Sequence, residues 1–337
     1  MSDTNQQLIE AFDARADRRN ERRDFFKAAF GAAAVAGAGV AAVSLGGGVA
    51  SAQTLTDADI LNFALNLEYL EAQFYLYAVN GAGLPAALTA SGATTSTAGG
   101  TVTGGAKVDF SGDALVGAYA KEIAADELAH VTFLRQQLGT AAVAMPNINI
   151  AGDATGAFTA AARAAGVVGA SDVFNPYASP ENFLLGAFIF EDVGVTAYKG
   201  AAPLLSSSTY IEASAGILAV EAYHAAIVRT SLYAKGIATP SKMLIEATEA
   251  ISNARDTLDG SPTLDQTRGT GPDDDQGVAN RSTTFGAAAN LAPLNENGLA
   301  YSRTPGQVLN IVYLKSGSAT AGGFFPNGVN GTIKTSG

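Results

Sequence analysis

Cysteine is absent from this 337-residue sequence, and its 20 lysines and arginines are outnumbered by 31 aspartates and glutamates. Without cysteine the chain cannot form disulfides or thiolate metal sites, so any metal must be held by oxygen and imidazole nitrogen. Such ligands suit iron or manganese better than a structural zinc ion. The net charge of −11 argues against nucleic acids and anionic membranes as partners. The hydrophobic share of 47% excludes a disordered chain.

Histidine is also scarce, and the two histidines occur in the same local pattern. Each follows a glutamate by three residues, as Glu127 with His130 and Glu221 with His224. On an α-helix these positions share a face about one turn apart, so each pair can aim a carboxylate and an imidazole at one point. A single pair of this kind is commonly an ordinary surface contact. Using both histidines in this way predicts a shared metal site.

The N-terminal region has the pattern of a targeting segment. Arg22 and Arg23 precede an uncharged run over residues 28–52, which ends in the cleavage pattern Ala50-Ser51-Ala52. The paired arginines resemble a twin-arginine export signal, which implies the twin-arginine export machinery as a partner and a periplasmic or extracellular location. Cleavage is expected after Ala52. The alternative is a retained anchor, because the run is long enough to span a bilayer, and membrane contact is expected only in that case.

Apolar residues at helical spacing, bounded by turn signals, predict four long helices. They cover Asp57 to Asn80, Asp113 to Leu138, Ser179 to about Leu205, and Tyr210 to Lys235, which is followed by Gly236. A loop over residues 81–110 is expected to be a surface insertion with a small hairpin around 101–103, and a connection over 140–178 to contain a short helix near 157–165. A long connection between the second and third helices lets the chain return along the bundle, as parallel repeats require.

The four expected helices form two similar halves. In the first half Glu68 is followed after seven residues by Tyr75, and in the second Glu191 is followed by Tyr198. Because seven residues make nearly two helical turns, each tyrosine lies on the face of its glutamate. These tyrosines are expected either to pack in the core or to donate to carboxylates of the facing helix. An arginine follows each histidine at the same offset, Arg135 and Arg229, and is expected in ion pairs near a helix C-terminus.

Together these residues resemble the ligand set of the ferritin-like dimetal carboxylate proteins, which include rubrerythrins, bacterioferritins and manganese catalases. The set is Glu68, Glu127, His130, Glu191, Glu221 and His224. The export signal, the loops and the tail at 302–309 resemble the desiccation-related group of that superfamily. The resemblance covers about residues 55–328 and implies an all-α, ferritin-like four-helix bundle that binds two divalent metal ions, iron or manganese. Two such ions would cancel the charge of four converging carboxylates.

The resemblance also assigns roles. Glu127 and Glu221 would bridge the metals, Glu68 and Glu191 would be terminal carboxylates, and the two histidines terminal nitrogen ligands. An aspartate at the position of Asp126 orients the histidine of the opposite motif in related bundles, here His224. The matching position for His130 is Val220, so unequal metal affinity at the two positions is expected.

Glu71 is a second departure from the pattern, because it lies three residues after Glu68 on nearly the same face. It could replace Glu68, join the site as an extra carboxylate, or lie outside it. The spacing to Tyr75 favours Glu68 as the ligand. Glu122, five residues before Glu127, is expected to point away.

Three regions are expected: a signal segment at 1–52, the bundle at 53–236 and a C-terminal extension at 237–337 that packs on the bundle. Within the extension we expect an amphipathic helix with Met243, Leu244 and Ile251 inward, a helix opened by a capping box at Thr304–Gln307, and an aromatic pair, Phe324-Phe325, on the bundle. Asp273–Asp275 is expected to be a solvated turn.

Two functions are compatible with these features. The first is an exported dimetal oxidoreductase that acts on hydrogen peroxide or dioxygen in stress protection, with catalase-, peroxidase- and ferroxidase-like chemistry left open. The alternative is a desiccation- or stress-associated structural protein in which the metal pair only stabilises the bundle. Iron storage in a cage is a weaker third reading, because the long loops and extension would obstruct shell packing. A homo-oligomer is compatible with all three.

Overall fold

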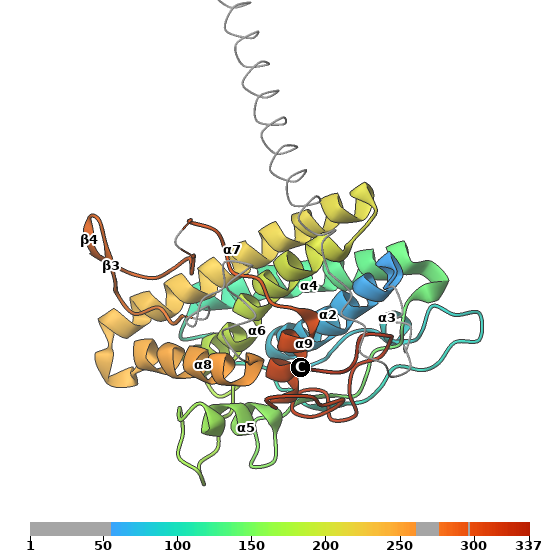
Figure 1. Cartoon of the computed structure of the whole chain (residues 1–337). Coiled ribbons are helices and arrows are strands. Elements are labelled where there is room, and N and C mark those ends of the chain that lie inside the picture. Colours follow the sequence, from blue (N-terminus) through green and yellow to red (C-terminus); the bar gives the residue numbers. More distant parts are fainter. Residues whose placement is uncertain (1–54, 261–275, 296) are drawn as a thin grey trace, which may run out of the picture. The chain divides into compact units, whose positions relative to one another are not determined.

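The computed structural model describes residues 55–260, 276–295 and 297–337 (Figure 1). The chain divides into two compact units, and the first, Met1–Gln53, lies outside the described residues. The expected signal residues Arg22, Arg23, Ala50 and Ala52, and the turn at 273–275, therefore also lie outside them. The described residues belong to the second unit, Thr54–Gly337.

The second unit is built around four long helices, as the sequence predicts (Figure 1). They are α2 (Asp57–Asn80), α4 (Ala114–Leu138), α6 (Pro180–Ala201) and α7 (Ser208–Ala238), with α2 packed on α4 and α6 on α7. Ser179 caps α6 by accepting from the Asn182 amide at 3.1 Å, and Pro180 occupies the first helical position. These elements confirm the all-α bundle.

Helix α7 extends to Ala238 and does not stop at Gly236 as expected. A Cβ on Gly236 would lie 2.7 Å from Ile245 Cγ1, so this glycine permits close packing of the following helix. By length and composition α7 could cross a membrane, with a window of mean hydropathy 1.3. However, Glu221, His224 and Arg229 are buried on its inner side, which indicates a bundle helix.

Cross-helix contacts fix the helix directions. Tyr75 on α2 contacts Glu191 on α6, whereas Tyr198 on α6 contacts Glu68 on α2, so these two helices are antiparallel. Helices α4 and α7 are antiparallel in the same way, as shown by the contacts of His224 with Asp126 and of Glu221 with His130. The bundle therefore consists of two helical hairpins facing each other, which accounts for the sequence repeat.

The two long connections meet each other. The first contains α3 (Ala86–Thr89) and β1 (Val102–Gly104), and the second contains β2 (Ile148–Ile150) and α5 (Ala157–Ala164), after the short 3-10 turn η1 (Gly139–Ala141). Strand β1 pairs in parallel with β2, with Val102 opposite Ile148. The expected hairpin around 101–103 is therefore wrong, because its partner strand comes from the crossover. Ile148 and Ile150 are fully buried, so the ladder ties both connections to the core.

The C-terminal residues pack against the bundle. The 3-10 turns η2 (Ala202–Leu204) and η3 (Pro240–Lys242) flank α7, and α8 (Leu244–Asp259), the β3–β4 hairpin (Arg281–Thr283 and Gly286–Ala288) and α9 (Pro305–Tyr313) follow. Both α8 and α9 contact α6. Met243 is 54% exposed, in contrast to the expectation, because it occupies the left-handed position before α8.

Two other expectations for this region are confirmed. Thr304 and Gln307 form the capping box of α9. Phe324 is fully buried, with its ring 4.9 Å from the ring of Phe190 on α6 and 5.1 Å from that of Phe158 on α5. The C-terminal aromatic residues thus close one side of the bundle core.

Candidate metal centre

The six residues of the expected ligand set converge inside the bundle, and none is more than 8% exposed. Glu68 comes from α2, Glu127 and His130 from α4, Glu191 from α6, and Glu221 and His224 from α7. Each lies in the middle of its helix, where neighbouring apolar residues pack the surrounding core. Burial of four carboxylates in one place is costly unless cations compensate them.

Around His130 the ligand atoms form one group. Its Nδ1 lies 3.2 Å from Glu68 Oε2, 3.7 Å from Glu127 Oε2 and 3.7 Å from Glu221 Oε1. Four ligand atoms, one from each of these residues, lie within 4.8 Å of one another. Three carboxylates and one imidazole nitrogen are an oxygen-rich set that suits iron or manganese.

His224 forms the second group. Its Nδ1 lies 3.1 Å from Glu127 Oε1 and 3.6 Å from Glu191 Oε2. Glu127 thus presents one oxygen to each histidine, and the two imidazole rings are 6.3 Å apart. Glu127 belongs to both groups, whereas Glu221 lies with the His130 group. The geometry places Glu127 between two candidate metal positions.

Eight buried atoms of these six residues have no hydrogen-bond partner within the part of the chain that the structure describes. They are Glu68 Oε2, both oxygens of Glu127, His130 Nδ1, Glu191 Oε2, both oxygens of Glu221, and His224 Nδ1. Buried polar atoms are nearly always paired, and an unpaired one costs about 1–3 kcal/mol. Since all eight converge on one volume, the residues fit a pair of divalent cations.

Two tyrosines hold the lone glutamates across the bundle. The Tyr75 hydroxyl donates to Glu191 Oε1, and the Tyr198 hydroxyl donates to Glu68 Oε1. In each glutamate the other oxygen, Oε2, is left for the centre. Both tyrosines are also buried, so they pack in the core and donate to the facing helix at once.

The two histidines differ in their outer contacts. His224 Nε2 lies 3.1 Å from Asp126 Oδ2, which leaves its Nδ1 toward the centre. For His130 the sequence-equivalent position is Val220, whose side chain offers no hydrogen-bonding atom. Asp126 is therefore placed to orient one of the two imidazoles.

Electrostatics without metal show how tightly the carboxylates are packed. Burial, followed by the charges of neighbouring carboxylates, raises the pKa of Glu221 and of Glu71 well above the usual range. Burial and the charge of Glu68 raise the pKa of Glu127 to about 7. Burial also opposes ionisation of Glu68, but attraction to His130 holds the pKa of Glu68 below its usual value.

The imidazoles respond in the opposite sense. Burial lowers their pKa, but the adjacent carboxylates outweigh it, Glu68 acting most strongly on His130 and Glu191 on His224. The pKa rises to about 11 for His130 and to about 12 for His224. Metal-free, the cluster therefore holds protons on both imidazoles and on several carboxyl groups, and two divalent cations would replace these protons.

Glu71 lies beside the centre, is 5% exposed and interacts with Glu68, Glu127 and Glu191. It is not in either group of converging ligand atoms, and Glu68 faces His130 in its place. Glu71 also lines a cavity of about 20 Å³ with Gly194 and apolar residues of α2, α6 and α9. This volume suits one molecule of the size of water.

The ion pair expected for each of the two arginines forms only for Arg229, and the expected position near a helix C-terminus holds only for Arg135. Arg135 donates to the Tyr69 hydroxyl at 2.5 Å and not to a carboxylate. Arg229 is fully buried in the interior of α7, where it pairs with Asp192 at 2.7 Å. Sequence reasoning missed Asp192, although its position directly after Glu191 in the repeat could have indicated it. Glu122 is exposed, as expected.

The fold and the cluster define a four-helix bundle of the dimetal carboxylate class. The chain belongs to the ferritin-like domain family, whose sequence profile matches residues 56–234. It is similar to the ferritin-like catalase Nec2 of Nesocodon mauritianus, with 29% identity over 82% of this chain and 84% of the relative. It is also similar to the desiccation-related protein PCC13-62 of Craterostigma plantagineum, with 28% identity over 81% of this chain and 80% of that relative.

Proposed function

We propose that this protein binds a dinuclear iron or manganese centre and uses it to convert hydrogen peroxide or dioxygen in stress protection after export. The observation that carries the proposal is the convergence of eight unpaired ligand atoms from four helices. Such a metal pair, when bound, supplies two ions that share the electron changes of O–O bond cleavage.

The protein groups around the centre have distinct tasks. Tyr75 and Tyr198 fix the orientation of the two lone glutamates through their hydroxyl donors. Asp126 holds the His224 ring so that Nδ1 faces the centre. Glu71 lies beside the centre and lines the small cavity, and in the metal-free chain burial raises its pKa well above the usual range. Apolar residues of α2, α6 and α9 line this cavity and limit the access of bulk water to it.

Peroxide is the favoured substrate. One of the similar proteins is named a ferritin-like catalase. Peroxide disproportionation needs no separate reductant, because one molecule is reduced to water while another is oxidised to dioxygen. Oxygen release from peroxide by metal-loaded protein would support this assignment, and iron oxidation without oxygen release would favour a ferroxidase.

The first test is the metal content of the purified protein, prepared without chelator and measured by mass spectrometry. We expect about two iron or manganese ions per chain. A Glu127→Ala/His130→Ala variant should lose them, whereas Glu122→Ala, on the exposed face of the same helix, should keep them. A wild-type chain that stays metal-free after reconstitution would overturn the proposal.

A structural role is the second candidate, because another similar protein is named desiccation-related. In that case the metal pair would stabilise the bundle by relieving the unpaired, like-charged cluster. Metal-dependent melting without turnover of peroxide or dioxygen would favour this function. Turnover that depends on the Glu127 and His130 ligands would exclude a purely structural one.

Export by the twin-arginine route, with cleavage after Ala52, is part of the proposal and rests on the sequence of residues 22–52. The exported protein should begin at Gln53, as measured by mass spectrometry of the intact chain. Replacing Arg22 and Arg23 together by lysine should keep the protein in the producing compartment. Export that is unaffected by this change would contradict the route.

A further inference from the structure

Each half of the bundle contains a second repeated contact outside the ligand set. The residue directly after the lone glutamate contacts the arginine five positions after the histidine of the same half. In the first half Arg135 Nη1 lies 2.5 Å from Tyr69 Oη. In the second half Arg229 Nη1 lies 2.7 Å from Asp192 Oδ2. Both contacts join a lone-glutamate helix to the Glu-x-x-His helix that packs on it.

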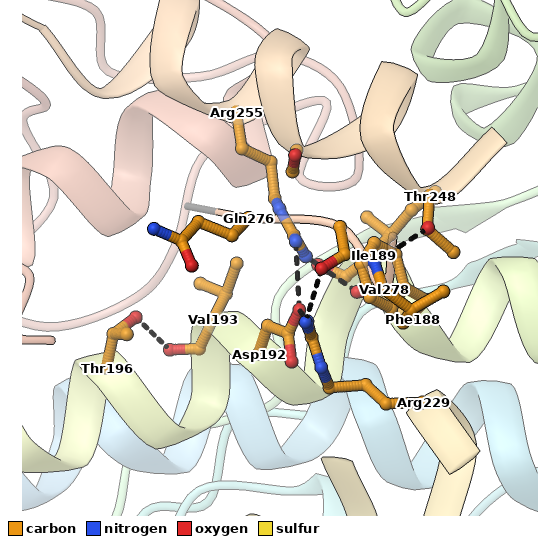
Figure 2. A network of polar contacts seen from close by, with 12 residues as sticks. Phe188, Ile189, Asp192, Val193, Thr196, Arg229, Thr248, Arg255, Gln276 and Val278 are labelled. Atoms are coloured by element: carbon orange, nitrogen blue, oxygen red, sulfur yellow. Dashed lines mark hydrogen bonds and ion pairs between the residues drawn. The ribbon is translucent and has the colours of Figure 1, made fainter. Parts of the chain in front are cut away.

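The contact in the second half joins charged groups, is buried, and includes a third residue. Figure 2 shows Asp192 between two arginines, Arg229 from α7 and Arg255 from α8. The Arg255 Nη2 to Asp192 Oδ2 distance is 3.0 Å. Arg229 Nη2 also donates to the carbonyl oxygens of Gly277 at 2.7 Å and Asn290 at 2.6 Å. These contacts connect α6 and α7 to α8 and to the segment after it, and we call Asp192, Arg229 and Arg255 the arginine clamp.

The clamp is anchored on neighbouring groups as well. Arg255 Nη1 donates to the Phe188 carbonyl on α6 at 2.6 Å, and both guanidinium groups lie over the Phe188 ring, at 4.6 and 5.4 Å. A buried guanidinium that lost its carboxylate would leave an uncompensated charge, so the pairing strongly fixes the helix positions. Because Asp192 follows Glu191 directly, a shift of the clamp moves that carboxylate.

The two halves differ in this respect. The acceptor in the first half is a neutral tyrosine, and Arg135 is half-buried. Arg229 in the second half is fully buried and pairs with a carboxylate. Outer contacts of metal ligands alter metal affinity by about 10–100-fold. The clamp joins α6 and α7, which carry both Glu191 and His224, whereas of the His130 group only Glu221 lies on these two helices.

We propose that the arginine clamp is a positioning device for the Glu191 and His224 side of the centre, and that α8 and residues 277–290 act on that side through it. Asp192, Arg229 and Arg255 do not touch the metal; they hold α6 against α7 so that the ligands of this side keep their separation. The inference rests on the two metal positions of the proposed function.

The test is manganese titration of the purified chain, followed by the electron paramagnetic resonance signal of free Mn²⁺. His130→Ala leaves the His224 side, and His224→Ala leaves the His130 side. Asp192→Asn should weaken binding about tenfold or more in the His130→Ala chain and less than about twofold in the His224→Ala chain. Tyr69→Phe is the matched control and should show the reverse preference.

A second variant disturbs the clamp from outside the bundle. A Cβ on Gly277 would lie 2.2 Å from Glu249 Oε1 and 2.6 Å from the Glu249 amide nitrogen, so Gly277→Ala must move the carbonyl that Arg229 uses. We expect Gly277→Ala, like Asp192→Asn, to weaken Mn²⁺ binding more in the His130→Ala chain than in the His224→Ala chain. Circular dichroism of each metal-free variant shows whether its helices still form, which separates unfolding from a displacement of the metal-binding side chains.

The outcomes distinguish this inference from the proposed function. Equal weakening in both single-histidine chains, or no weakening in either, would overturn the clamp as a positioning device. If a single-histidine chain binds no Mn²⁺, the native chain is titrated stepwise, and Asp192→Asn must weaken one of the two bound ions while leaving the other. A native chain without bound metal would overturn the proposed function itself.

Discussion

Stability of the metal-free protein should fall as the pH rises from 5 to 8. The pKa of Glu127 is raised to about 7 in the folded chain from its ordinary 4.5, so the folded state holds a proton that the unfolded chain releases. This contribution is fully present below pH 4.5 and is lost as the pH rises through 7. The rise of this pKa from 4.5 to about 7 corresponds to about 3 kcal/mol, most of which is lost between pH 5 and 8.

Other groups of the cluster act in the same direction. The raised pKa values of Glu71 and Glu221 stabilise the folded chain at low pH and are lost as the pH rises. The pKa of His130 is raised from 6.5 to about 11, and that of His224 to about 12, so their contributions are full below pH 6.5 and are lost toward pH 11–12. All of these groups therefore make the metal-free chain less stable as the pH rises from 5 to 8.

The assay is thermal unfolding of chelator-treated and metal-loaded protein at pH 5, 6, 7 and 8 and constant ionic strength. At about 2–4 °C per kcal/mol, Glu127 alone predicts a fall of roughly 6–12 °C in the metal-free Tm. The Tm of the metal-loaded protein should exceed that of the metal-free protein by a growing margin as the pH rises, because metal binding then has fewer protons to displace. Glu127→Gln should reduce the fall of the metal-free Tm with pH, and Glu122→Gln should leave it unchanged. A metal-free Tm that stays flat or rises over this range would refute the reasoning.

Two substitutions test the geometry of the centre. In Gly194→Ala the new Cβ would lie 2.4 Å from Glu221 Oε2, so the carboxylate must move and metal content should fall below two ions per chain; Gly216→Ala on α7, with nothing within 4 Å, should keep full occupancy. Unchanged metal content in Gly194→Ala would contradict the placement of Glu221. Tyr198→Phe removes the donor to Glu68 and should lower the free energy of unfolding by about 1.5–3 kcal/mol in urea titrations, whereas no loss would show that this contact is energetically neutral.

Local sequence determined the helices and the ligand spacing. The Ser179-Pro180 start of α6 and the capping box of α9 depend on neighbouring backbone groups, so they can be recognised without the fold. The pairing of Glu127 with His130, and of Glu221 with His224, follows equally from the helical repeat. The repeated pattern then indicated that the four helices share one centre.

Contacts between segments far apart in the sequence could not be predicted from the local pattern. The parallel pairing of Val102 with Ile148 joins two loops that are each weak in strand signals, and only their meeting in the fold creates the ladder. Met243 has the apolar character of a core residue, but the backbone turn before α8 directs it to solvent. The strand pairing thus depends on the packing of remote elements, whereas the exposure of Met243 follows from the left-handed backbone before α8.

The sequence by itself determined which residues could hold metal, because the spacing of carboxylate and imidazole along a helix is fixed by its 3.6-residue turn. Tertiary structure alone decided how those residues are supported. It brings Tyr198 to Glu68 across the bundle, leaves Glu71 beside the ligands, and joins Asp192 to an arginine of α8. These contacts depend on how one helix is placed against another, and helical periodicity carries no information about that placement.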